Sequence, residues 1–223
     1  MLEQLLPNWE RGGDELISAM WDTLQMTAIA GSIAFVLGII FGVLLVVTKR
    51  GGLLENLWIY NFLDKIINWI RSIPFLILLV LVVPFSRAIV GTGTGELGAI
   101  IPLIFGTVPF FSRQIETAIA EIDTGLIEAS LAMGKPPLEI IFSVYLRESI
   151  PSIARVTQIT MINLVALTTL TGAIGAGGLG DFAIRFGHQL RLRDLLWATI
   201  AVIVVIVSAI QGIGNVVIKW ARR

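Results

Sequence analysis

The chain has 223 residues, of which 56% are hydrophobic and only 14% are charged, and its mean hydropathy is +0.87. Soluble domains carry about 25% charged residues, so this composition indicates an integral membrane protein. The lack of cysteine excludes a disulfide scaffold and thiolate chemistry, and a single histidine disfavours zinc or triad chemistry. Equal numbers of basic and acidic residues, 16 each, give nucleic-acid binding no electrostatic support.

Five membrane spans are predicted from the distribution of charge along the chain. A helix needs about 20 largely apolar residues to cross the hydrocarbon layer of a bilayer. Three uncharged runs of 26, 25 and 24 residues meet that length, and two runs of 15 and 16 residues meet it when apolar neighbours are added. The fold class is therefore expected to be an all-α integral membrane protein. The expected spans cover about residues 22–48, 64–86, 92–113, 154–176 and 195–218.

The basic residues predict which side of the membrane each chain end occupies, because lysine and arginine are enriched in cytoplasmic segments. The larger group, assigned to the cytoplasm, contains Lys49, Arg50, Lys65, Arg71, Arg113, Lys135, Arg147, Arg155, Lys219, Arg222 and Arg223. The smaller group contains Arg11, Arg87, Arg185, Arg191 and Arg193. We expect an extracytoplasmic segment at 1–20, a membrane domain at 21–218 and a cytoplasmic tail at 219–223. The acidic N-terminal segment is not expected to be a secretory signal, which begins with basic residues.

On the first span, Ala34, Gly38 and Gly42 recur every four residues. Small residues at this spacing line one face of a helix and let a neighbouring helix approach closely. We interpret this stripe as a packing surface between spans, not as a binding site.

The longest hydrophilic segment, the 121–147 loop, is expected to form two short helices on the cytoplasmic side. Asp123 or Thr124 is suited to cap the first helix, and Gly134 is suited to end it in the left-handed conformation. The proline pair at 136–137 then opens a second helix. The apolar face predicted for that helix carries Leu138, Ile141, Phe142 and Tyr145. The residues alone leave open whether this segment is only a solvated connector.

Within this loop Glu128-Ala129-Ser130 is followed after three residues by Gly134 and after nine more by Val144-Tyr145-Leu146. This motif resembles the EAA loop of ABC-importer permeases, which reads Glu-Ala-Ala, three residues, Gly, nine residues, Ile, any residue, Leu-Pro. Ser130 replaces the second Ala, which exchanges one small residue for another. Arg147 stands where the family often has Pro, so we expect the second helix to end differently.

Further segments extend the resemblance, from about residue 21 to residue 223, to the permease subunits of methionine importers. They are Arg71-Ser-Ile-Pro-Phe-Leu-Ile-Leu-Leu, Pro84-Phe-Ser-Arg-Ala-Ile-Val-Gly-Thr92, Gly125-Leu-Ile-Glu-Ala-Ser130 and Gly172-Ala-Ile-Gly-Ala-Gly-Gly-Leu-Gly180. The resemblance implies a type I ABC-importer permease fold with five spans and an extracytoplasmic N-terminus. It also implies a homodimer in the bacterial cytoplasmic membrane, with two ATPase subunits on one side and an extracytoplasmic methionine-binding protein on the other.

The resemblance also implies which residues dock the ATPase. They are Glu128, Ala129, Ser130, Met133, Gly134 and Lys135. The sequence has no Gly-x-x-x-x-Gly-Lys-Ser/Thr loop to hold phosphates, so ATP and Mg are expected on the partner ATPase. No catalytic, cofactor-binding or metal-ligating residue is expected in this chain, which we interpret as a transport subunit and not an enzyme.

Candidate pathway or gate residues lie in and after the fourth span: Gln158, Met161, Asn163, Gly175 and Gly177. Polar side chains inside spans mark transport pathways or hydrogen-bond neighbouring helices, and both interpretations stay open. The run Gly175-Ala-Gly-Gly-Leu-Gly180 matches the dinucleotide pattern G-x-G-x-x-G. That pattern binds a cofactor only between a strand and a helix, so we interpret this run as a turn at the outer end of a span.

Two alternatives to a methionine permease remain at this stage. The first keeps the same role and changes the cargo to another amino acid or a short peptide. The second, from a different class, is a secondary transporter driven by an ion gradient. A secondary transporter is expected to carry an acidic or histidine relay inside the membrane, and the five uncharged runs contain no acidic residue.

Overall fold

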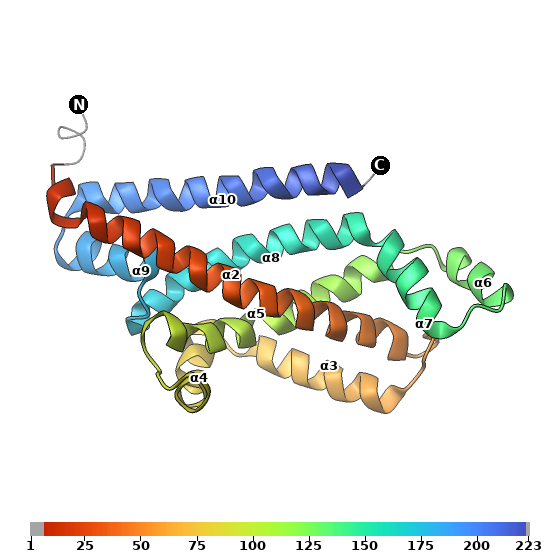
Figure 1. The fold of residues 1–223 in the computed structure, drawn as a ribbon. Helices are drawn as coiled ribbons and strands as arrows, with labels where there is room; N and C mark the ends of the chain where they lie inside the picture. The colour runs from red at the N-terminus through yellow and green to blue at the C-terminus, as the bar shows by residue number, and fades with distance from the viewer. Residues whose placement is uncertain (1–6, 222–223) are drawn as a thin grey trace. The chain divides into compact units, whose positions relative to one another are not determined.

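The computed structural model describes residues 7–221, and every regular element in that range is helical (Figure 1). Residues 1–6 of the predicted N-terminal segment and 222–223 of the predicted tail lie outside it. The α-helices are α2 (Trp9–Thr48), α3 (Leu57–Ser72), α4 (Phe75–Val90), α5 (Gly95–Ala120), α6 (Thr124–Ala132), α7 (Pro137–Ile140), α8 (Ile150–Thr171), α9 (Gly178–Phe182) and α10 (Arg193–Ala221). Short π or 3₁₀ turns are η1 (Ile141–Leu146), η2 (Gly172–Ile174) and η3 (Ala183–Gln189).

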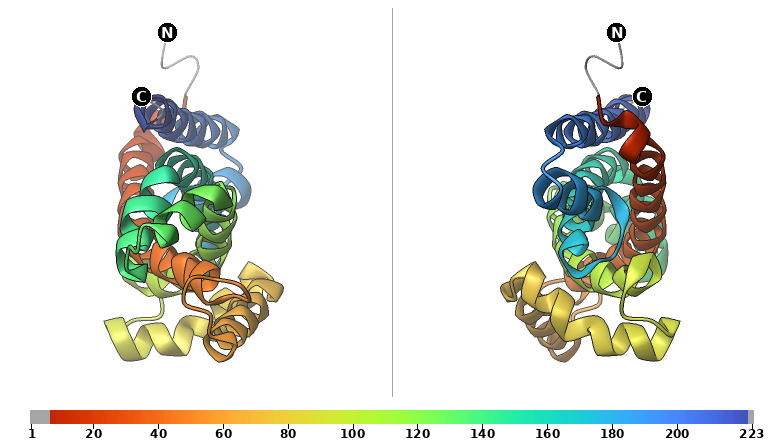
Figure 2. Two further views of the ribbon diagram at one scale, coloured as in Figure 1. Left: turned by 90° about the vertical axis from the view of Figure 1, so that its right-hand side faces the viewer. Right: turned by 90° about the vertical axis from the view of Figure 1, so that its left-hand side faces the viewer.

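Four of the described helices are long and apolar enough to cross a membrane: α2, α5, α8 together with η2, and α10. A fifth crossing results if α3 and α4 are counted as one broken span. The sequence predicts one continuous span at 64–86, but the structure has two helices there with a break between them. Further views of the helices are given in Figure 2. Pro74 explains the break, because proline lacks an amide hydrogen and disfavours helical conformation in the residue before it. Pro74 itself is extended, with φ −54° and ψ 134°, and precedes the first turn of α4.

The chain divides into two compact units. The first unit contains Met1–Ile33, Ile73–Thr107 and Met161–Gln211. Its core has two clusters of buried apolar residues. One cluster joins α2 to α9, η3 and α10, and the other joins α2 to α5, α8 and Ala176. The largest fully buried side chains in these clusters are Met26, Leu103, Leu164, Leu179, Phe182 and Leu195.

The second unit contains Ala34–Ser72, Val108–Thr160 and Gly212–Arg223. A single cluster of buried residues joins the last turn of α2, the second half of α5 and the 121–147 loop. Its buried members are Val46, Val47, Phe111, Ile115, Ile119, Ile140, Ile141, Val144 and Tyr145. The loop is therefore built into the core of this unit and is not a detached connector.

Within the second unit an ionic cluster joins α3 to α5. The guanidinium of Arg113 donates to Asp64 on α3, and its Nη1 donates to Glu116 Oε2 at 2.6 Å. All three side chains are partly buried, with 17–29% of each exposed, so removal of one partner would leave a charge poorly compensated. This cluster fixes α3 on α5 beside the apolar core.

The small residues on α2 pack against α5, as the sequence predicts. A methyl group added to Gly38 would lie 2.4 Å from Phe111 Cδ1. One added to Gly42 would lie 2.5 Å from Ile115 Cγ2 and 2.8 Å from the backbone oxygen of Ser112. Lipid tails are as apolar as side chains, so close packing of this kind contributes much of the affinity between helices in a bilayer.

We expect Gly42→Ala to lower the free energy of unfolding by about 1–3 kcal/mol, because α2 and α5 must separate to admit the methyl group. Gly212→Ala is the matched control, since Gly212 also lies inside a helix and a methyl group there would meet no atom within 4 Å. Thermal unfolding of the purified protein in detergent measures both. Equal unfolding temperatures for Gly42→Ala and the wild-type chain would contradict the packing assignment.

Candidate functional site

The first helix of the 121–147 loop begins and ends where the sequence predicts. Asp123 precedes α6 in an extended conformation, and its Oδ1 accepts a hydrogen bond from the amide of Gly125 at 2.8 Å. Beyond the helix, Gly134 has a φ of +76° and its amide donates to the carbonyl of Leu131 at 2.9 Å. Residues other than glycine rarely adopt this backbone conformation. Both terminal signals of α6 are therefore confirmed.

The second helix of the loop differs from the prediction in the face that it buries. Ile141 and Tyr145 are buried as expected, but Leu138 and Phe142 are 66% and 68% exposed. Ile140 and Val144 occupy the core in their place. Residues 138–146 are apolar around most of the helix, so periodicity alone could not select the inward face. Contact with α2 and α5 selects it, and a second apolar face remains on the outside.

The predicted docking residues fall into an exposed group and a buried one. Glu128 and Ala129 on α6 are exposed, and Met133 just beyond it is 68% exposed. Lys135 is half-buried, and its Nζ lies 3.4 Å from Glu139 Oε1. Ser130, in contrast, is only 4% exposed. This burial explains why the residue at this position is small, and it places the Ser130 side chain on the inner side of α6.

The 121–147 loop exposes several large apolar side chains, and two of them, Leu126 and Leu131, were not predicted as site residues from the sequence. An ordinary aqueous surface rarely gathers so many, and where it does the patch usually marks an interaction site. Tyr145, on the opposite side of the loop, is packed in the core, and burial raises the pKa of its phenol. The exposed set consists of Leu126, Leu131, Met133, Leu138 and Phe142.

The glycine-rich stretch lies between helices. Gly175 and Gly177 have φ values of 71° and 80°, and the segment leads from η2 into α9. A turn is therefore confirmed, and the strand that a dinucleotide site would need is not found in this segment. A methyl group on Gly172 would lie 2.4 Å from the carbonyl carbon of Gly180, and one on Gly180 would lie 2.0 Å from the carbonyl oxygen of Thr169.

Side chains of α2 hold this turn in place within the first unit. The amide of Leu179 donates to Thr23 Oγ1 at 2.9 Å, and the amide of Gly178 donates to Asp22 Oδ2 at 3.4 Å. Nearby, the guanidinium of Arg185 contacts Asp181 at 2.6 Å and Glu15 at 3.1 Å. Partial desolvation lowers the pKa of Arg185, but the two carboxylates outweigh it and raise that pKa above its usual value.

The polar candidates on α8 do not form one site. Gln158 Nε2 donates to Asn215 Oδ1 of α10 at 3.4 Å, and its side chain lies over Gly214. Met161 packs against Gly31 of α2 in the core of the first unit. These contacts favour the helix-packing interpretation for Gln158 and Met161. Asn163 is half-buried further along α8.

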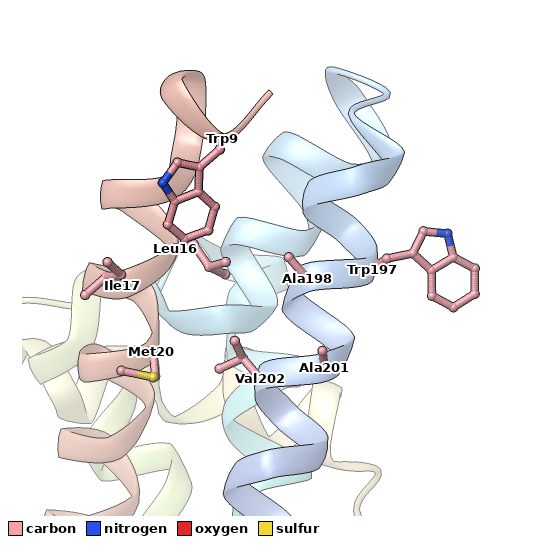
Figure 3. A pocket seen from close by; sticks show the side chains of 8 residues that line it. All are labelled: Trp9, Leu16, Ile17, Met20, Trp197, Ala198, Ala201 and Val202. Atoms are coloured by element: carbon pink, nitrogen blue, oxygen red, sulfur yellow. The ribbon is translucent and has the colours of Figure 1, made fainter. Parts of the chain in front are cut away.

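An apolar groove of about 430 Å³ lies in the first unit between the N-terminal parts of α2 and α10 (Figure 3). The side chain of Trp197 points away from α2, as Figure 3 shows. No charged side chain lines the groove, so it offers no partner for the ammonium and carboxylate of an amino acid. The lining residues are Trp9, Leu16, Ile17, Met20, Trp197, Ala198, Ala201 and Val202.

Comparison with known proteins places these features in one family. The model of the family described as "Binding-protein-dependent transport system inner membrane component" matches residues 34–222. The methionine import system permease protein MetP of Bacillus subtilis is 39% identical over 217 residues, which are 97% of both chains. The D-methionine transport system permease protein MetI of Escherichia coli is 48% identical over 138 residues, or 62% of this chain and 64% of that protein.

Solved structures agree with this assignment. A chain of the MetNI methionine ABC transporter, solved in inward-facing conformations, matches with a TM-score of 0.93 and 41% identity over 96% of this chain and 99% of that chain. A chain of an amino acid ABC transporter crystallised with histidines has the same fold, with a TM-score of 0.79 at 18% identity, over 96% of this chain and 97% of that chain. The all-helical permease fold, the EAA-like loop and the apolar helices thus have one explanation: this chain belongs to the inner-membrane components of binding-protein-dependent transport systems.

Proposed function

We propose that this chain is the membrane-spanning permease subunit of an ATP-driven importer that carries methionine into the cell. The observation that carries the proposal is the likeness to methionine permeases along almost the entire chain, at 39% identity over 97% of its length in one of them. The fold agrees with a subunit of a methionine ABC transporter at a TM-score of 0.93.

The energy for uptake comes from a partner ATPase that binds ATP and Mg, because this sequence contains no phosphate-binding loop of its own. We place the ATPase contact on the outer surface of the 121–147 loop. Glu128 supplies a charge there, while Ala129 and Gly134 leave room for close approach. The exposed apolar side chains of the loop, Met133 and Phe142 among them, lose contact with water when a partner covers them.

Movement of the loop is transmitted to the spans through its buried side. Val144 and Tyr145 belong to the same packed core as Val46 of α2 and Ile115 of α5. Packed cores move as units because their side chains interdigitate at crystal-like density. Closure of the ATPase therefore displaces the cytoplasmic ends of α2 and α5. Alternating access requires a movement of the spans of this kind.

The remaining partners complete the transport path. A second copy of this chain forms a homodimer around the path, and an extracytoplasmic binding protein delivers methionine to its outer end. Gly175 and Gly177 form a turn that we assign to this outer end, and Asn163 is the polar candidate left on α8 for the path itself. The apolar lining of such a path suits a thioether side chain.

The same geometry also accommodates another amino acid or a short peptide as cargo, and the binding protein would select among them. An ion-driven secondary transporter is a weaker alternative, because the described loop carries the exposed docking surface that such a transporter does not need.

We expect the permease, reconstituted with its ATPase and binding protein, to take up labelled methionine only when ATP is supplied. Excess unlabelled methionine should abolish the signal, and unrelated amino acids should leave it unchanged. Uptake by the permease alone, in liposomes without ATP, would refute the proposal. If another amino acid competes as well as methionine, the proposed transport role stands and the proposed cargo is wrong.

We expect Glu128→Lys and Gly134→Leu each to reduce ATP-dependent uptake by at least about tenfold. The first reverses a charge at the docking surface, and the second forces a branched side chain into a left-handed conformation that costs about 1–2 kcal/mol. Both variants should insert like the wild-type chain; Glu128→Lys should also unfold like it, and Gly134→Leu should unfold at a somewhat lower temperature because of that strain. Glu55→Lys, an equal charge reversal on the 49–56 connection, is the control. Normal uptake by Glu128→Lys would show that the docking surface lies elsewhere.

A further inference from the structure

One side of α3 is polar, although this helix forms the first half of the broken span. The polar residues recur every three or four positions, which places them on one face of the helix. A second exposed side, with the same spacing, is wholly apolar, as a surface in contact with lipid should be. Because hydrocarbon offers polar side chains no hydrogen bonds, the polar side must face water or protein. The polar residues are Asn61, Asp64, Lys65, Asn68 and Arg71, and the apolar ones are Trp58, Phe62, Ile66 and Trp69.

Arg71, at the far end of this polar side, lies deep in the membrane. Asp64 is bonded to Arg113, which directly follows the uncharged run of α5 on its cytoplasmic side. Arg71 is seven residues beyond Asp64 on the same helix, or about 10 Å farther along it. Further on, Phe75 packs over Gly106 of α5 in the first unit, where an added methyl group would lie 2.9 Å from the ring. Since the hydrocarbon layer is about 30 Å thick, Arg71 lies closer to its middle than to its edge.

Arg71 has no counter-ion among the described residues. Its side chain is exposed and takes part in none of their ion pairs, whereas Arg113 is held by both Asp64 and Glu116. A charged side chain inside a membrane is rare, and it pairs with another charge or lines a water-filled pathway. The break at Pro74 points the same way, because non-helical backbone at this depth must border protein or a water-filled cavity.

We propose that Arg71 binds the carboxylate of the amino-acid cargo, at the membrane-interior end of a water-filled path lined by the polar side of α3. The inference rests on the proposed function, since it assigns a contact with the cargo of that transport. A guanidinium presents parallel donors that match the two oxygens of a carboxylate. Every free amino acid has this carboxylate, so the contact holds methionine without selecting its side chain.

The test uses the complex of the permease with its ATPase in lipid nanodiscs, without nucleotide or binding protein, and one introduced cysteine as a reporter. The permease has no cysteine of its own, so its modification by a charged thiol reagent, measured by intact mass, reports a single position. Asn68→Cys lies on the polar side of α3, and Ile66→Cys lies on the apolar side as the matched control. The first should react at least about tenfold faster, because only a thiol in contact with water ionises readily and meets the reagent.

Methionine should protect Asn68→Cys from the reagent, because Arg71 lies one helical turn away. Methionine amide, which lacks the carboxylate, should not protect it. Arg71→Gln should raise the methionine concentration for half-protection by at least about tenfold. Arg71→Lys should raise it by a smaller factor, since lysine keeps the charge and loses the paired donors. Arg50→Gln, which removes an exposed charge from the 49–56 connection, should leave protection unchanged.

The unfolding temperature separates cargo binding from a structural role. Arg71→Gln should unfold like the wild-type chain, because Arg71 has no ion pair with a described residue to lose. A lower unfolding temperature would overturn the inference, since it would show that Arg71 pairs within the assembled protein. The inference also falls if Asn68→Cys reacts no faster than Ile66→Cys, or if methionine gives no protection.

Two further results would overturn the carboxylate contact itself: protection by methionine amide equal to that by methionine, and protection that Arg71→Gln leaves intact. Failure of the proposed function is recognised separately. If the wild-type complex, supplied with its binding protein and ATP, takes up no methionine, the permease assignment has failed. If the wild-type complex takes up methionine and Arg71→Gln does so equally well, the transport role stands and the Arg71 contact is wrong.

Discussion

The core that the 121–147 loop shares with α2 and α5 is the contact on which the proposed coupling depends. Ile140, Val144 and Tyr145 fill the space between the ends of these helices, so the loop cannot shift without moving them. Each fully buried aliphatic side chain of this kind contributes about 1.5–3 kcal/mol where water is excluded. α5 is one unbroken helix from Gly95 to Ala120, so the loop packs against the end of a continuous helix.

Glycine supplies the close contacts that hydrophobicity cannot supply inside a bilayer. Gly42 on α2 meets Ile115 of α5, and Gly214 on α10 meets the amide of Gln158 on α8. In both places the missing side chain makes room for a specific neighbour. This reduces the range of arrangements that the helices can adopt, because only the register that aligns glycine with its neighbour avoids a clash. Helix packing in this protein is therefore specified by small residues as much as by large ones.

The sequence allowed the chain class, the approximate helices and the ends of α6 to be predicted, because charge, length and capping act locally. The break at Pro74 was not placed within the span predicted at 64–86, since a proline in an apolar run can either bend a helix or interrupt it. The prediction of which face of the second loop helix is buried was only half correct. Leu138 and Ile140 are equally apolar, and only the position of α2 and α5 decides which of the two is buried.

An acidic pocket beside the start of α6 could not be predicted from the sequence because its carboxylates come from both ends of the loop. Glu121 follows α5 and Glu148 precedes α8, and the fold of the residues between them brings the two together. The loop as a whole presents three different surfaces. Its inner side is packed, its outer side exposes Met133 and Phe142, and its flank holds negative charge and an unpaired hydroxyl. Of these three surfaces, the exposed apolar one gains most when another protein covers it and removes it from water.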